Sequence, residues 1–414
     1  MRVLHVNLSD LSGGAAIAAW RLHQGLLDLD VDSNILAYRI IQQDDPRVHR
    51  LVSGRRRQIY RVQLKLEQWL SKLQKDPMVF HCSPNLWTSP LVERINSLNP
   101  DLVHLHWVAA DILPLNALRE IKQPIVWTHH DMWPFCGAEH YSYDERWETG
   151  YSKNSRSAEA SGLDLNRFVW RRKLHAWRDV PVTHVGPSRW MSECAEQSKL
   201  WKGSEGSRFE VIPNGLNTQV FRPYDQRQAR EELGLSADAK LLLFGAHSVS
   251  SSIKGGDLLC DVLNLLKEDS GDDCQLVTFG AGAFNPPAEY QHRHLGSISD
   301  LEYLAKLYSA ADVMLIPSRL EAFGQTASEA LSCGTPVVCF DTSGLRDIVL
   351  HQNNGYRAEC YDCSDFVEGV RWCLAEFQSG LDSEQWEATH ARFSTENVAQ
   401  KYYELYTGEI DRDV

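Results

Sequence analysis

Two glutamates, eight residues apart, flank the start of an expected helix in the second half of the chain. Glu321 and Glu329 belong to the run Glu-Ala-Phe-Gly-Gln-Thr-Ala-Ser-Glu-Ala-Leu, residues 321–331. Gly324 permits a tight turn, so we expect the helix to begin at Gln325. Backbone N–H groups at a helix start lack intrahelical acceptors and favour phosphate. The spacing covers about two helical turns and could therefore follow a sugar nucleotide, with a sugar near Glu321 and a ribose near Glu329.

The elements around this run are those of an α/β domain. An apolar run with strand character, Val313–Ile316, precedes Pro317-Ser318, and a second apolar pair, Val337-Val338, follows the helix. Doubly wound α/β domains bind ligands beyond the carboxyl ends of their parallel strands. Taken alone, the two glutamates would equally suit an ordinary strand–loop–helix unit with solvated carboxylates.

The segment from His294 to Val338 resembles the Glu-x7-Glu region of retaining glycosyltransferases with the two-domain GT-B fold, in particular glycosyltransferase family 4. The resemblance implies a nucleotide-sugar donor, with the sugar oriented by Glu321 and the ribose held by Glu329. It implies no catalytic metal and no cofactor. The donor-binding residues that it implies are Gly13, Gly14, Lys254, His294, Leu295, Phe323, Gly324, Gln325, Thr326 and Glu329.

A lysine after an earlier strand completes the expected phosphate site. Lys254 follows the strand-like run Lys240–Gly245 and matches the family lysine that contacts the donor pyrophosphate. The family often has an arginine just after the strand glycine, where this chain has Ala246. The resemblance implies that catalysis rests on Glu321, on Lys254 and on a histidine of the N-terminal half, His130. Because no side chain is placed as a nucleophile, we expect the front-face mechanism that is proposed for the family.

The N-terminal half begins with a strand, a glycine loop and a helix. The strand Val3–Leu8 leads through a loop that ends in Gly13-Gly14 to a helical run, Ala15–Leu27. The loop lacks Gly-x-Gly-x-x-Gly, which weighs against a dinucleotide site. It is either a tight turn alone or a close approach to the donor phosphates.

A histidine-rich segment follows another expected strand, Pro124–Thr128. His130 matches by position the cleft histidine of bacterial exopolysaccharide enzymes of the family. A histidine there can bond to a sugar hydroxyl or steady developing charge. The alternative is a cation site formed by His129, His130 and His140. No Asp-x-Asp occurs in a loop that follows a strand, so we expect no metal.

Residues Arg55–Lys75 have helical periodicity and carry seven basic residues against one acid, Glu67. Ile59, Val62, Leu66, Trp69, Leu70 and Leu73 share one face. Two interpretations stay open. The helix either docks on anionic lipid headgroups or is a surface helix that packs on its own domain with its basic face solvated.

Composition limits the function classes. The chain has 414 residues and a net charge of −13, which argues against nucleic-acid binding. No apolar run reaches the length of a membrane span, and the N-terminus is typical of a first strand. The ten cysteines have no disulfide-framework spacing. We expect a cytoplasmic protein, and the inner face of the cytoplasmic membrane stays open as its location within the cytoplasm.

These observations predict an α/β fold with two Rossmann-like domains that face a cleft. Residues 1–205 would bind the acceptor, 206–394 the nucleotide sugar, and a helix in 395–414 would cross back to the first domain. The expected activity is retaining, metal-independent hexosyl transfer from a UDP- or GDP-sugar to a glycan or lipid-linked acceptor in cell-surface polysaccharide synthesis. The alternatives are a GT-B nucleotide-sugar epimerase and a non-catalytic nucleotide-sugar-binding subunit.

Overall fold

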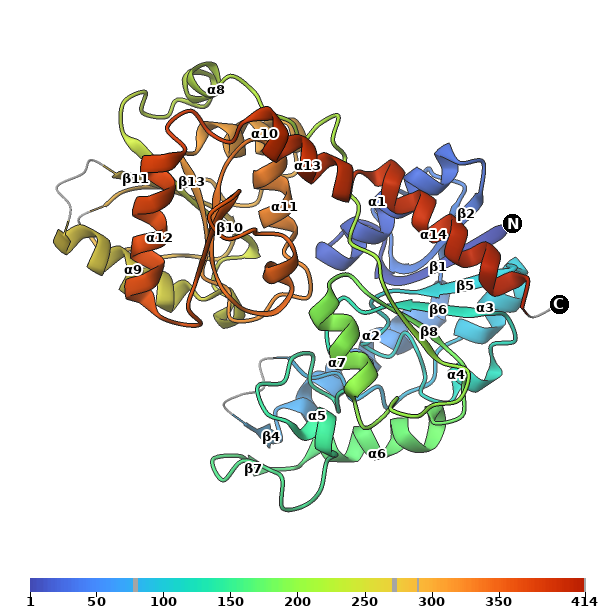
Figure 1. The fold of residues 1–414 in the computed structure, drawn as a ribbon. Helices are drawn as coiled ribbons and strands as arrows, with labels where there is room; N and C mark the ends of the chain where they lie inside the picture. Colours follow the sequence, from blue (N-terminus) through green and yellow to red (C-terminus); the bar gives the residue numbers. More distant parts are fainter. Residues whose placement is uncertain (77–80, 270–273, 289, 413–414) are drawn as a thin grey trace. The chain divides into compact units, whose positions relative to one another are not determined.

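The computed structural model describes residues 1–76, 81–269, 274–288 and 290–412, shown in Figure 1. The chain forms two compact units. Met1–Pro213 and Val398–Val414 make up unit 1, and Asn214–Asn397 make up unit 2. Among the described residues, no helix is long and apolar enough to cross a membrane.

Unit 1 is built on a seven-stranded sheet in which every neighbouring pair of strands runs parallel. The order is β3-β2-β1-β5-β6-β8-β9, so the chain reverses its direction of travel across the sheet between β1 and β5. Ligand sites of open α/β sheets lie at such a switch point. The strands are β1 (Arg2–Ser9), β2 (Asp32–Arg39), β3 (Val48–Arg50), β5 (Leu102–Leu105), β6 (Ile125–Thr128), β8 (Thr183–Gly186) and β9 (Arg208–Val211).

Seven helices and a small two-stranded sheet complete the described part of unit 1 before residue 214. This sheet pairs β4 (Gln74–Lys75) antiparallel with β7 (Ser161–Gly162). The helices are α1 (Gly14–Asp28), α2 (Gly54–Ser71), α3 (Leu91–Leu98), α4 (Ala117–Glu120), α5 (Arg146–Thr149), α6 (Leu165–Trp177) and α7 (Arg189–Gln197).

Unit 2 has a six-stranded parallel sheet in the order β12-β11-β10-β13-β14-β15, with its switch point between β10 and β13. The strands are β10 (Lys240–Ser248), β11 (Cys274–Ala281), β12 (Gln291–His294), β13 (Val313–Ile316), β14 (Val337–Phe340) and β15 (Gly355–Ala358). The helices are α8 (Gln226–Leu233), η1 (Ser252–Lys254), α9 (Gly256–Asp269), α10 (Leu301–Ala310), α11 (Gln325–Ser332), η2 (Ser343–Asp347), α12 (Cys363–Glu376) and α13 (Ser383–Phe393).

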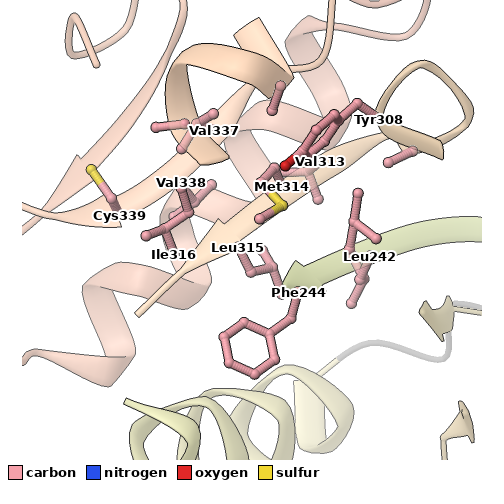
Figure 2. Packing of buried hydrophobic residues seen from close by; sticks show 14 of the residues in the cluster. Leu242, Phe244, Tyr308, Val313, Met314, Leu315, Ile316, Val337, Val338 and Cys339 are labelled. Carbon is pink, nitrogen blue, oxygen red and sulfur yellow. The ribbon is translucent and has the colours of Figure 1, made fainter. Parts of the chain in front are cut away.

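The core of unit 2 explains why its strands read as continuous apolar runs. Every residue of β13 and β14 is buried, because helices cover both faces of a parallel sheet. Figure 2 shows Met314 and Leu315 of β13 packed among Leu242, Phe244 and Val338. This packing holds the carboxyl end of β13 in place, where the candidate site begins.

The last helix, α14 (Thr395–Ile410), packs on unit 1. Its Val398, Ala399, Tyr402 and Tyr406 are buried against a cluster that includes Val3. In Figure 1 this red helix lies along the strands and α1 of unit 1. The fold-class prediction is confirmed: two parallel α/β units, with a C-terminal helix that returns to the first.

One element prediction was wrong in extent. The helix expected over Arg55–Lys75 ends at Ser71, since the chain then extends to pair with β7.

Candidate functional site

An ion pair lies at the switch point of unit 2. Lys254 follows β10 and Glu321 follows β13, and Lys254 Nζ is 2.6 Å from Glu321 Oε1. The Ser318 hydroxyl donates to the same oxygen at 2.9 Å. The Glu321 side chain is 10% exposed and that of Lys254 is 28% exposed, so the carboxylate is fixed while the ammonium still reaches solvent. The structure thus brings together two of the predicted catalytic residues.

Backbone contacts fix the loop that carries Glu321. The Glu321 N–H donates to the Ser343 hydroxyl at 2.9 Å, and the Glu321 carbonyl accepts from the Gly344 N–H at 2.9 Å. A Cβ on Gly344 would lie 2.6 Å from the Ala322 carbonyl oxygen, so only glycine fits this close approach. The η2 segment therefore positions the backbone of Glu321, while Lys254 and Ser318 contact its side chain.

Arg319, which sequence analysis missed, joins the two loops. Its guanidinium donates to both carboxylate oxygens of Asp257, at 2.7 and 2.6 Å, and to the Ser252 carbonyl at 2.8 Å. Its own N–H donates to the Ile253 carbonyl at 2.8 Å. This bidentate arrangement holds the turn of Lys254 against the Glu321 loop. The sequence signal for Arg319 is its position directly after Pro317-Ser318, the two residues that follow β13.

The helix α11 begins where predicted. Gly324 has a φ of 111°, and a Cβ there would lie 2.7 Å from the Leu345 side chain. Its carbonyl accepts from the N–H groups of Ala327 and Ser328. Gln325 and Thr326 are half-buried, and N–H groups at such first positions have no acceptor inside their own helix. The arrangement suits a phosphate group.

The second glutamate lies deeper in α11. Glu329 is buried and its Oε2 accepts from the Tyr308 hydroxyl of α10 at 3.0 Å. Tyr308 is fully buried, so this hydrogen bond fixes the carboxylate from the core side. Tyr308 was part of the sequence resemblance but was not assigned to the site.

Other predicted donor residues lie apart from the ion pair. Phe323 is 3% exposed and packs against the Phe393 ring, so its side chain belongs to the core. His294 and Leu295 are at the edge strand β12, with β11 and β10 between them and β13. His294 Nδ1 is 2.9 Å from the Thr278 hydroxyl. Ala246 is buried in β10.

The glycine loop of unit 1 has an open surface at Gly13. This residue precedes α1 with a φ of 93°, and a Cβ there would meet nothing within 4 Å. Gly14 is the first residue of α1. The positive φ explains the glycine at position 13 as a turn requirement, while the open space leaves room for a ligand.

His130 ends a chain of three hydrogen-bonded imidazoles. Its Nε2 is 3.1 Å from His106 Nδ1, and His106 Nε2 is 3.0 Å from His5 Nδ1. In each pair one ring donates and the other accepts, so the tautomer of His130 is coupled to those of His106 and His5. Burial lowers the pKa of His130 to about 4, against a smaller opposing effect of Asp131. His130 is therefore neutral at pH 7 and suits hydrogen bonding to a hydroxyl.

The alternative cation site does not form. His129 bonds to His184 at 2.9 Å, and His140 contacts Asp131 at 2.6 Å and Ser83 at 2.9 Å. The described group with metal-like spacing is instead His5, His104 and His106, with ligand atoms within 4.8 Å of one another. Both His104 nitrogens already contact hydroxyls, those of Tyr406 and Thr128.

A hollow of about 690 Å³ lies elsewhere in unit 1, beside α6. It contains none of the predicted site residues, so it is separate from the candidate site. Its lining includes Arg167, Phe168, Arg171, Arg172 and His175.

Solved structures share the fold over nearly the whole chain. Sucrose-phosphate synthase from Thermosynechococcus elongatus superposes with a TM-score of 0.69 at 19% identity, covering 99% of both chains. Anabaena Alr3699/HepE in complex with UDP-glucose superposes with a TM-score of 0.64 at 17% identity, covering 99% of this chain and 100% of the other. The two-unit α/β architecture is thus that of GT-B glycosyltransferases.

Curated relatives match a shorter region. A D-inositol 3-phosphate glycosyltransferase of Geodermatophilus obscurus is 34% identical over 189 residues, 42% of each chain. That of Xylanimonas cellulosilytica is 34% identical over 202 residues, 44% of this chain and 47% of the relative. The chain spans about half the length of the curated relatives that it matches.

Two family models cover most of the sequence. The model described as "Glycosyl transferases group 1" matches residues 225–380, within unit 2. The model described as "Glycosyltransferase Family 4" matches residues 12–220, half of the chain. The chain belongs to glycosyltransferase family 4.

Proposed function

We propose that this protein transfers a hexosyl group from a UDP- or GDP-sugar to a glycan or lipid-linked acceptor, with retention of the anomeric configuration. The observation that carries the proposal is the Lys254–Glu321 pair at the switch point of unit 2, in the same unit as the N-terminus of α11. Family membership supports a glycosyl transferase. The structural similarity to Alr3699/HepE, which was crystallised with UDP-glucose, supports a nucleotide-sugar donor.

The chemistry follows from the charges. In a front-face reaction, the bond between the anomeric carbon and the phosphate oxygen breaks as the acceptor oxygen bonds to the same face, and the leaving phosphate receives the acceptor proton. Lys254 and the first amides of α11 would stabilise the negative charge on that phosphate. Glu321 would orient the sugar, and His130, neutral at pH 7, would bond to one of its hydroxyls.

The remaining assignments concern the units and the setting. We assign donor binding to residues 206–394, including Gln325, Thr326 and Glu329, and acceptor binding to residues 1–205. Gly13-Gly14, His294 and Leu295 are assigned to the donor as secondary contacts. We further propose a role in cell-surface polysaccharide synthesis at the inner face of the cytoplasmic membrane, where a lipid-linked acceptor would be available.

The test of the proposed activity is the stereochemistry of the product. We would incubate the protein with UDP- and GDP-hexoses and lipid-linked or oligosaccharide acceptors, then assign the anomeric proton of the new linkage by NMR. An anomeric configuration equal to that of the donor is expected. Inversion, or epimerised sugar nucleotide formed without any acceptor, would contradict the proposal.

Glu329 should govern donor affinity. Glu329→Ala is expected to raise the donor KM by about 10- to 150-fold with little change in kcat, because a lost hydrogen bond to a charged group costs roughly 1.5–3 kcal/mol. Tyr308→Phe is the matched control, since it removes the hydroxyl at 3.0 Å but leaves the carboxylate in place. An unchanged donor KM in folded Glu329→Ala protein would remove the ribose role from this residue.

Turnover should not require a divalent cation. The sequence has no Asp-x-Asp in a loop after a strand, and Lys254 already supplies a positive charge beside Glu321. Protein freed of metal by EDTA and desalting is expected to retain its kcat within about twofold, since a bound cation would otherwise contribute several kcal/mol. Loss of activity that manganese or magnesium restores would overturn this prediction.

A further inference from the structure

The helix α2 has an apolar face that the described residues of unit 1 leave exposed. We define the α2 stripe as Ile59, Val62, Leu66, Trp69 and Leu73, which recur at helical spacing and continue two residues beyond the helix. Their exposed fractions are 58%, 65%, 40%, 56% and 37%. Each other described helix carries at most one exposed large hydrophobic residue. The helix does pack on its own unit through Tyr60 and Glu67 and its basic residues are exposed, as the second interpretation predicts, but this packing leaves the stripe exposed.

The packing of α2 explains why the stripe faces outward. The residues that it buries are Tyr60 and Glu67, which lie on a different side of the helix. The Tyr60 hydroxyl donates to the Ala110 carbonyl, and Glu67 accepts from the Asn85 N–H at 2.6 Å. These two buried hydrogen bonds fix the rotation of the helix about its axis. Turning the stripe inward would break both.

The exposed surface beside the stripe is strongly basic. Burial and the nearby Asp111 raise the pKa of Glu67, the single acid of this segment, to about 8, so it adds little negative charge to the surface at neutral pH. Arg56 of α2 pairs with Glu93 of the neighbouring helix α3 at 2.9 Å, and both side chains are exposed. The basic flank comprises Arg55, Arg56, Arg57, Arg61, Lys65, Lys72 and Lys75, all exposed.

The apolar surface extends beyond the helix. The N–H of Leu163 donates to the Leu73 carbonyl at 3.0 Å, next to the β4–β7 pair. The Leu163 side chain is 49% exposed. The segment that follows β7 therefore adds a sixth large apolar side chain at the C-terminal end of the stripe.

We propose that the α2 stripe and its basic flank dock the protein on an anionic lipid bilayer, with α2 lying in the plane of the headgroups. An apolar face beside lysines and arginines is what an interfacial helix requires, since one inserts between acyl chains and the other meets the headgroup charge. The local positive charge is the complement of an anionic surface, and beyond the Debye length of about 8–10 Å the chain's net charge of −13 is screened. The proposal deepens the proposed function because it would bring the protein to a lipid-linked acceptor.

The experiment measures flotation of the full-length protein with vesicles of phosphatidylcholine alone or with 30% phosphatidylglycerol, in 50 and 500 mM salt. Binding is expected to the anionic vesicles and to fall at least tenfold at high salt. Val62→Gln/Trp69→Gln should reduce binding to the anionic vesicles at least tenfold, as should Arg57→Ser/Arg61→Ser/Lys65→Ser. These side chains are exposed, so the variants should keep the wild-type Tm.

Leu301→Gln is the matched control, since Leu301 is 43% exposed but lies on α10 of unit 2; its vesicle binding should equal that of the wild type. No flotation at low salt would overturn the proposal, as would equal losses in Leu301→Gln. Sedimentation velocity without lipid supplies the last arm: a dimer that Val62→Gln/Trp69→Gln dissociates would assign the stripe to a second copy of this chain and overturn the bilayer assignment. Donor-induced thermal stabilisation, measured in solution, tests the proposed function separately.

Discussion

Glu321→Gln is expected to lower kcat by about 10²- to 10³-fold, the usual effect of removing one preorganised electrostatic group from an active site. The variant replaces a carboxylate that is bonded to Lys254 and Ser318 by a neutral amide of the same shape. The donor KM should change little, because we assign Glu321 to the orientation of the reacting sugar rather than to the nucleotide. Initial rates at varied donor concentration separate the two parameters.

The control for this substitution is Glu376→Gln, an exposed glutamate at the end of α12 in the same unit. It changes the charge of unit 2 by the same amount and should leave both kinetic parameters unchanged. A wild-type kcat in Glu321→Gln protein would contradict the catalytic role of Glu321. If Tm falls in Glu321→Gln protein but not in Glu376→Gln protein, the ion pair stabilises the fold.

Acid should unfold unit 1 before unit 2. Burial lowers the pKa of nine histidines in unit 1 but of only one of the five histidines in unit 2, all of which are described, and that one is the half-buried His292. The nine are His5, His23, His49, His81, His104, His106, His129, His130 and His184.

The sign and size follow from proton linkage. A histidine whose folded pKa lies below the usual 6.5 takes up its proton only in the unfolded chain, so its contribution to stability is lost as the pH falls below about 6.5. Glu67, Glu139 and Asp111 act in the opposite direction, since burial raises their pKa. Because nine histidines oppose these three carboxyls, unit 1 loses stability as the pH falls, by about 1.4 kcal/mol per pH unit for each net proton taken up on unfolding.

Hydrogen exchange with mass spectrometry between pH 7 and 4.5 resolves the two units. Tryptophan fluorescence supplements it, because eleven of the thirteen tryptophans lie in unit 1. His23→Gln, which keeps a partner for Ser33, should reduce the slope by about 1.4 kcal/mol per pH unit. Simultaneous loss of protection in both units, or earlier loss in unit 2, would contradict the assignment of neutral buried histidines.

The elements of unit 2 were predictable because its local signals agree with one another. The apolar run Val313–Ile316 is a strand buried on both faces, and Gly324 is needed at a φ of 111° before α11. The resemblance then supplied the two-unit fold, which neither periodicity nor composition contains. Lys254 and Glu321 were predicted as site residues, and their contact at 2.6 Å is a property of the tertiary structure.

Other features depend on contacts between distant segments. Arg319 reads as a surface residue until β10 and β13 lie side by side and bring it to Asp257. The imidazole chain joins His5 from within β1 to His106 and His130, which follow the ends of β5 and β6. The periodicity of the apolar residues in α2 was evident from the sequence. Which side of the helix faces the core was not evident, because the polar contacts of Tyr60 and Glu67 decide it.

Donor binding is the measurement that tests the central claim most directly. Hydrogen exchange would be followed in the wild type and in Lys254→Met/Glu329→Gln, with UDP-glucose, UDP-galactose and GDP-mannose in turn. We predict that at least one sugar nucleotide protects the segments around Lys254 and 318–332, and raises Tm by mass action. The double variant should lose both effects while keeping its fold. Protection that is absent with every donor, or that persists unchanged in the double variant, would contradict the assignment of this site.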